Sequence, residues 1–190
     1  MTESEFIGLV LRNRTNAEIL TRLPSLGLSD AWLVSGCLFQ TVWNVADGQA
    51  PEHGIRDYDL FYFDPDTSWE AEDAAIRRIV EAFFDLGVEV ELRNQARAHL
   101  WYETKFGAPY PPLMRAAEGI DRFLMHNAMV GLRPNGSGLD VYAPQGFDDI
   151  AAKIVRPNKT ANFQAARYRE KAGRWKALWP SLTILDPDCA

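Results

Sequence analysis

The first hundred residues contain apolar stretches that repeat at helical or strand intervals. Residues 3–22 carry apolar side chains at helix-like spacing and stop just before Pro24, so we predict one helix there. The short apolar runs AWLVSG, DYDLFYFD and VEVELRN predict three strands. Between these strands, CLFQTVWNVADG and residues 69–86 predict two helices, each closed by a glycine.

The second half of the chain has weaker periodicity. The stretch RNQARAHLWY is expected to continue along the same side as the third strand. The prolines of FGAPYPP predict a loop. NAMVGLRP and LDVYAP flank NGSG and predict a hairpin. FDDIAAKIV predicts a short helix, and residues 160–178 predict a final one. This order predicts an α+β (α/β-like) fold, a mixed central sheet flanked by helices with a C-terminal hairpin and helices.

The size of the chain favours one domain over residues 1–190, with a core at about 25–150 and a C-terminal helical portion at about 147–190. Its composition, 47% hydrophobic and 24% charged, is that of a globular protein rather than a disordered one. No apolar run is long enough for a membrane span, and the start lacks a secretory pattern. We therefore expect a cytoplasmic location and no membrane partner, with Cys37 and Cys189 as free thiols.

The formal net charge of −6 argues against nonspecific DNA or RNA binding, which requires an excess of Lys and Arg. The charge is uneven along the chain. Residues 47–91 hold 13 acidic and 3 basic side chains, whereas residues 153–176 hold 8 basic side chains and one acidic. One segment is suited to a cation and the other to an anion, unless the two simply face each other or solvent. Lys153, Arg156 and Lys159 fit either a triphosphate or a solvated face.

Two aspartates open the second predicted strand. Because alternate residues of a strand point to the same face, Asp57 and Asp59 present both carboxylates on one side. Mg²⁺ prefers oxygen ligands of this kind, so the pair predicts a metal site, the alternative being an acidic strand rim. A neighbouring strand would supply a third acid, Glu89 or Glu91, and we favour Glu91. Asp57, Asp59 and Glu91 would then converge on two metal ions and act in catalysis.

Candidate phosphate contacts come from two other places. Ser35 and Gly36 lie between a predicted strand and a helix, where a glycine lets a ligand approach and the helix start offers free N–H groups. An ordinary tight turn is the alternative. Arg97 is a candidate for nucleotide binding, and it fits equally a role in capping a helix or in pairing with the acidic segment.

The order of strand, small-residue turn, helix, D-x-D strand, helix and acidic strand resembles the nucleotidyltransferases of the DNA polymerase beta superfamily. More closely, the chain is similar to a bacterial nucleotidyltransferase-like family of unknown substrate. The strings that carry this resemblance are SGCLFQTVWN, IRDYDLFYFD, VELRNQARAHLWYETKFG, VYAPQGFDDIAAKIVRPN and YREKAGRWKALWPSL. One departure is the turn, which reads Ser35-Gly36 where the superfamily usually has Gly then Ser.

The resemblance implies a nucleotidyltransferase core, Mg²⁺ as cofactor and a nucleoside triphosphate such as ATP as donor. It assigns catalysis and metal binding to Asp57, Asp59 and Glu91, and nucleotide binding to Ser35 and Gly36. The acceptor, a small molecule, an RNA end or a protein, stays open. The alternative is a nucleotide-binding or protein-interaction module on the same fold that has lost transfer. A metal-dependent hydrolase would use the same acids, but the three scattered histidines do not supply its usual cluster.

Overall fold

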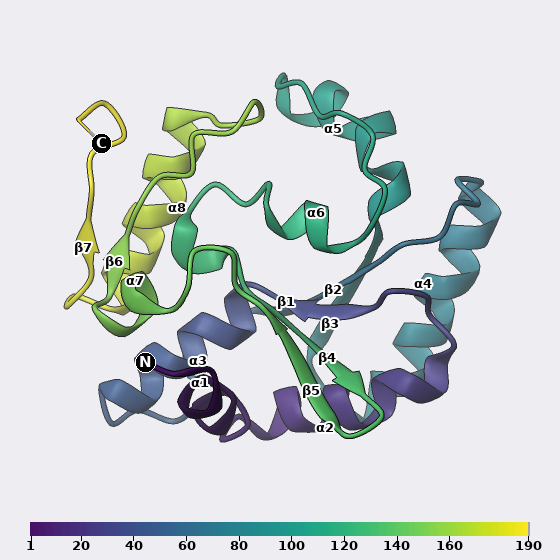
Figure 1. The fold of residues 1–190 in the computed structure, drawn as a ribbon, viewed down its shortest axis with the longest axis horizontal. Coiled ribbons are helices and arrows are strands. Elements are labelled where there is room, and N and C mark those ends of the chain that lie inside the picture. The colour runs from purple at the N-terminus through teal and green to yellow at the C-terminus, as the bar shows by residue number, and fades with distance from the viewer. Residues whose placement is uncertain (190) are drawn as a thin grey trace.

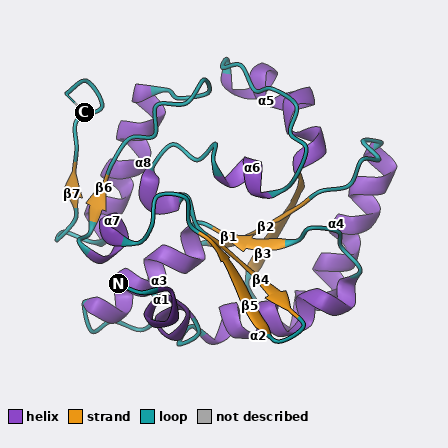
Figure 2. Cartoon of the chain, viewed as in Figure 1, coloured by secondary structure: helices purple, strands orange, loops and turns teal. Residues whose placement is uncertain are grey.

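A five-stranded mixed sheet forms the centre of the protein, with helices around it (Figures 1 and 2). The computed structural model describes residues 1–189. The strand order is β3-β2-β1-β4-β5, and the strands span the following residues: β1 Trp32–Val34, β2 Asp57–Tyr62, β3 Glu89–Asn94, β4 Gly131–Asn135 and β5 Gly138–Tyr142. The predicted α+β fold with a mixed central sheet is confirmed.

The pairing of the strands explains why the sheet is mixed. β1 pairs antiparallel with both β2 and β4, and β4 pairs antiparallel with β5 through the predicted NGSG hairpin. β2 and β3 are parallel, because the helix α4 (Trp69–Phe83) carries the chain back between them. A small parallel pair, β6 (Ile154–Val155) with β7 (Thr183–Ile184), lies apart from the main sheet near the C-terminus (Figure 1).

The remaining helical segments differ in length and in how the sequence encodes them. They are α1 Glu3–Val10, α2 Arg14–Arg22, η1 Leu23–Leu26, α3 Gly36–Ala46, η2 Phe84–Leu86, η3 Gln95–Arg97, α5 Ala98–Phe106, α6 Ala117–Ile120, η4 His126–Ala128, α7 Asp148–Ala151 and α8 Ala165–Leu178. No helix within residues 1–189 is both long and apolar enough to cross a membrane.

The single N-terminal helix predicted for residues 3–22 is wrong. The chain forms α1 and α2 with a break at residues 11–13, and Asn13 is the N-cap of α2. Asn13 Oδ1 accepts hydrogen bonds from the backbone N–H of Thr15 and Asn16, and its amide donates to Thr41 on α3. A buried tertiary partner for the cap therefore overrides the continuous helical periodicity.

The expectation that RNQARAHLWY continues the strand side is also wrong, because β3 ends at Asn94. The Asn94 side chain accepts a hydrogen bond from the N–H of Ala96 and starts the turn η3, which leads into α5. Helix α5 lacks a one-sided apolar face, so its sequence carried no helical signal. Its C-cap, Gly107, has φ +68°, a conformation that glycine adopts without strain.

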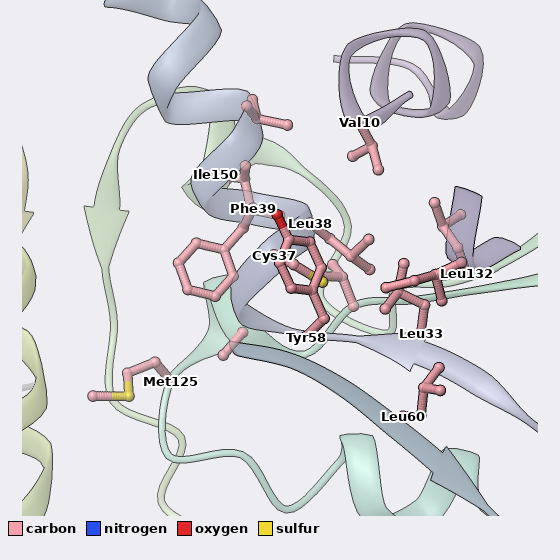
Figure 3. Close-up of a cluster of buried hydrophobic side chains, with 14 of the residues drawn as sticks. Val10, Leu33, Cys37, Leu38, Phe39, Tyr58, Leu60, Met125, Leu132 and Ile150 are labelled. Atoms are coloured by element: carbon pink, nitrogen blue, oxygen red, sulfur yellow. The ribbon is translucent and has the colours of Figure 1, made fainter. Parts of the chain in front are cut away.

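Helix α3 lies at the centre of the core and holds the C-terminal helix in place. Figure 3 shows its side chains packed against those of β1, β2 and α7, among them Phe39, Tyr58 and Ile150. Trp43 of α3 makes edge contacts with Trp175 of α8 and with Trp179, at ring-centroid distances of 5.9 and 5.6 Å. This tryptophan packing positions α8 against α3, beside the sheet strand that carries the two aspartates.

Candidate active site

The alternation of β2 separates its polar face from the core. Tyr58, Leu60 and Tyr62 are buried in the main hydrophobic cluster together with α3 and α4. Asp57 and Asp59 therefore project from the opposite face, as the spacing predicts. They line a cavity of about 280 Å³, the turn cavity, which is bounded by Ser35, Gly36, Gln40, Gly54, Arg56, Asp57, Asp59, Lys171, Arg174, Trp175, Leu178 and Trp179.

Strand β3 brings the candidate glutamates beside the aspartates. The parallel register places Asp57 opposite Glu89 and Asp59 opposite Glu91, so all four carboxylates share one face of the sheet. Glu89 is exposed, whereas the Glu91 side chain is 35% exposed and accepts a hydrogen bond from Arg93 at 2.9 Å. Across residues 1–189, no three His, Cys, Asp or Glu side chains form a ready-made metal cluster. Asp57 and Asp59 are thus a pair, with Glu91 beside them on the next strand.

The environment of Asp59 disfavours the ionised form of its carboxyl group. Burial, followed by the charge of Asp57, raises the pKa of Asp59 to about 7, although the ammonium of Lys171 opposes the shift. Burial likewise lowers the pKa of Lys171, with Asp59 opposing that shift. One lysine therefore does not neutralise the two aspartates. An additional cation at this position would stabilise the ionised form of Asp59.

The turn between β1 and α3 reaches the same cavity. Ser35 is 2% exposed and has φ +59° and ψ −116°, a backbone conformation that is strained for any residue except glycine. Its N–H donates to the carbonyl of Val130, and its side chain makes no capping bond to α3. A Cβ at Gly36 would lie 3.3 Å from Gln40 Nε2, so the absence of a side chain lets the helix start border the cavity. Ser35, Gly36, Asp57 and Asp59 are thereby brought together.

Arg97 is not brought to this cavity. Its guanidinium donates to the carbonyl of Ser68, and its Nε lies 3.0 Å from Glu72 at the start of α4. Both ion-pair side chains are nearly buried, at 13% and 14% exposure. These contacts match the alternative interpretation, pairing with the acidic segment, and the assignment of Arg97 to nucleotide binding stays a prediction.

Two functional candidates on α8, Lys171 and Arg174, were not singled out from the sequence. They line the turn cavity opposite the aspartates. The available signal was their spacing: Arg167, Lys171 and Arg174 follow at i, i+4 and i+7, which places them on one helix face. Lys153 and Arg156, named from the sequence instead, are held by Asp47 and Asp149.

The donor set of the turn cavity fits Mg²⁺ together with a polyphosphate. Two carboxylates on one strand face are the oxygen ligands that this cation takes. Burial and the neighbouring Asp57 raise the pKa of Asp59, and a bound cation would lower it. On the other walls, the start of α3 offers N–H groups that lack intrahelical partners, and Lys171 and Arg174 offer cations. Carboxylates on one side and phosphate-binding groups on the other are what a metal-bound triphosphate requires.

Comparisons with known proteins identify the fold and the family of the chain. The sequence profile of a family described as nucleotidyltransferase matches residues 21–184. A solved structure, determined by NMR and described as revealing a CCA-adding enzyme head domain, superposes with a TM-score of 0.79. It is 24% identical in sequence, and the match covers 97% of this chain and 96% of that one. No curated protein matches the sequence. The family match spans most of the chain and includes every candidate site residue, so the protein belongs to this nucleotidyltransferase family.

Proposed function

We propose that the protein transfers a nucleoside monophosphate from a nucleoside triphosphate to an acceptor hydroxyl with Mg²⁺ as cofactor. The observation that carries this proposal is the turn cavity, in which Asp57 and Asp59 face the start of α3 and the cations of α8. Because α8 completes the cavity, we further propose that residues 1–190 act as a single nucleotidyltransferase-like domain.

Each wall of the cavity has a separate task. Asp57 and Asp59 would hold the metal, with Glu91 adjacent on β3. Bound there, Mg²⁺ supplies positive charge that polarises the α-phosphate and the acceptor hydroxyl. Ser35, Gly36 and the first N–H groups of α3 bind the β- and γ-phosphates, and Lys171 and Arg174 balance the negative charge of the departing pyrophosphate.

The transfer needs no covalent intermediate. The acceptor oxygen forms a bond to the α-phosphorus, and the bond from that phosphorus to the oxygen bridging to the β-phosphate breaks. Pyrophosphate leaves with the electron pair, and the carboxylate of Glu91 takes the hydroxyl proton and releases it to solvent. Positioning and charge stabilisation supply the rate enhancement.

The direct test uses each α-labelled triphosphate with Mg²⁺ and a cell extract as the source of acceptor. Asp57→Asn is expected to reduce label transfer by about 10²–10³-fold, as loss of a group that stabilises transition-state charge does. Chelation of the metal should abolish transfer. The matched control is Asp188→Asn, whose side chain is 70% exposed near the C-terminus and should leave transfer unchanged. Transfer that survives Asp57→Asn would remove the metal-binding role.

A second candidate is a nucleotide-binding module on the same fold that has lost transfer. Two observations favour it. Arg93 already engages Glu91, and the turn reads Ser35-Gly36 where the superfamily that the chain resembles usually has Gly then Ser. This candidate predicts binding of the Mg²⁺–nucleotide complex without pyrophosphate release, which the labelling experiment distinguishes from transfer.

A further inference from the structure

A second cavity, of about 370 Å³, adjoins the turn cavity and shares Lys171 and Arg174 with it. We call it the ring cavity. Phe61 of β2 forms part of its wall, and on a strand Phe61 lies only about 7 Å from Asp59 along the same face. A ligand in the ring cavity can therefore present a group to the centre where Asp59 lies.

The ring cavity has an excess of positive charge. Its lining contains five basic side chains and one acidic side chain, Glu170. Arg93 is paired with Glu91, but Arg122, Arg167, Lys171 and Arg174 form no ion pair with any carboxylate in the described part of the chain. Arg122 Nε is buried and has no hydrogen-bond partner. Lys171 interacts with Asp59, and both Lys171 and Arg174 also line the turn cavity. In a protein of net charge −6, the two remaining cations, Arg122 and Arg167, indicate a further anionic ligand.

The same cavity presents flat, polarisable surfaces. Phe61 stacks on Phe123 at a centroid distance of 5.4 Å, and Tyr102 lies 4.3 Å from Tyr110. The amide of Gln95, which is 3% exposed, borders the cavity and packs against Gly119, where a Cβ would come within 2.2 Å of it. Aromatic faces and one fixed amide are suited to a planar ring that carries hydrogen-bonding groups.

The nucleoside of the donor does not account for this chemistry. A donor nucleoside is uncharged, whereas Arg122 and Arg167 line the ring cavity and do not line the turn cavity. Arg167 donates to the Tyr102 hydroxyl at 3.3 Å and lies over the Phe106 ring at 3.7 Å, but neither arginine meets a carboxylate of the described residues. A neutral ligand would leave both charges without a counter-charge. The ligand of the ring cavity must therefore carry an anionic group of its own.

Building on the proposed function, we propose that the ring cavity is the acceptor site and that the acceptor is a small phosphorylated compound with a planar ring. Arg122 and Arg167 bind its phosphate, the aromatic side chains contact its ring, and its hydroxyl points toward Asp59. The volume suits a molecule the size of one nucleotide. The net negative charge of the protein disfavours a long polyanionic acceptor such as an RNA strand.

The test measures binding without turnover, by calorimetry in the presence of Mg²⁺ and a saturating non-hydrolysable triphosphate analogue that fills the turn cavity. The probes are the four nucleoside 5′-monophosphates, the corresponding uncharged nucleosides and a short RNA oligonucleotide. At least one monophosphate is expected to bind, and its affinity should fall about 10-fold or more in both Arg122→Gln and Arg167→Gln. Arg77→Gln, on the exposed face of α4 and 76% exposed, is the matched control and should bind normally.

Four results would overturn this assignment: no binding of any monophosphate, equal binding of the uncharged nucleosides, displacement by the triphosphate analogue, or an equal loss in Arg77→Gln. An oligonucleotide that binds far more tightly than every monophosphate would replace the small acceptor with a nucleic acid end. Thermal melting of each variant separates loss of binding from loss of fold. Failure of label transfer alone would reject the proposed function. Calorimetry would still test separately whether the ring cavity binds a monophosphate.

Discussion

The two faces of strand β2 differ in whether their polar side chains have partners within the protein. On the core face, the Tyr58 hydroxyl accepts a hydrogen bond from the buried amide of Asn13 at 3.3 Å, and the same amide donates to Thr41 at 3.1 Å. On the opposite face, called here the cleft face because it borders the turn cavity, Asp59 forms no ion pair with another described residue. Burial, together with the charge of Asp57, raises the pKa of Asp59 to about 7.

This difference separates polar groups that stabilise the fold from those that are held ready for a ligand. A buried polar group costs free energy unless it is partnered, and Asn13 is fully partnered within the protein. The cost at Asp59 is compensated only in part within the protein, by the charge of Lys171. Changes on the core face should therefore alter stability, and changes on the cleft face should alter binding and transfer.

The largest stability effect is expected from Leu60→Ala. Leu60, which follows Asp59 on β2, is fully buried in the core, so its truncation should lower the free energy of unfolding by about 2–5 kcal/mol. Chemical denaturation measures this loss. Val80→Ala, at a side chain 57% exposed on α4, should change it by less than about 0.5 kcal/mol. Equal effects at the two positions would contradict the placement of the core.

The next effect is the pH dependence that Asp59 imposes on the metal-free protein. The folded-state pKa, about 7, lies above the unfolded value of 3.8, so the stability that Asp59 contributes is full below 3.8 and is lost as pH rises toward 7. Between pH 6 and 8 this amounts to about 1.4 kcal/mol.

Comparison with Asp59→Asn removes the titration of Asp59. Because Asp59 opposes the lowering of the Lys171 pKa, the substitution also lowers that pKa further. A lowered lysine pKa makes stability rise with pH, so both changes act in the same direction on the difference between the two proteins. The unfolding free energy of the wild type should decline more than that of the variant across this interval. Mg²⁺ should restore stability to the wild type at pH 8 and have little effect on Asp59→Asn. If the unfolding free energies of the two proteins varied with pH in parallel, the fold would not raise the pKa of Asp59.

The smallest effect is expected from Tyr58→Phe. The substitution removes the hydroxyl that accepts from Asn13 but leaves the bond from Asn13 to Thr41, so about 1 kcal/mol of stability should be lost. Label transfer should stay at the wild-type level, since the hydroxyl is on the core face. A Tyr58→Phe protein that unfolds normally but fails in transfer would break the division between the two faces.

The sequence predicted those parts of the site that follow from a short-range pattern, such as strand alternation or a turn before a helix. The alternation of DYDLFYFD is enough to place Asp57 and Asp59 on the face opposite Leu60, and a glycine turn before a helix is enough to locate Ser35 and Gly36. The sequence places Glu91 beside Asp59 only if β2 and β3 are neighbouring strands. Their pairing and register are long-range properties that the structure provides.

What the tertiary structure decided depends on contacts between distant segments. Arg97 turns to Glu72, the helix expected over residues 3–22 breaks at Asn13 because Thr41 supplies a partner, and α5 forms without an amphipathic pattern. Above all, tryptophan packing of α8 on α3 brings Lys171 to the aspartates. Strand and helix periods are local properties of a sequence, whereas the partner of each charge is set by which elements pack together.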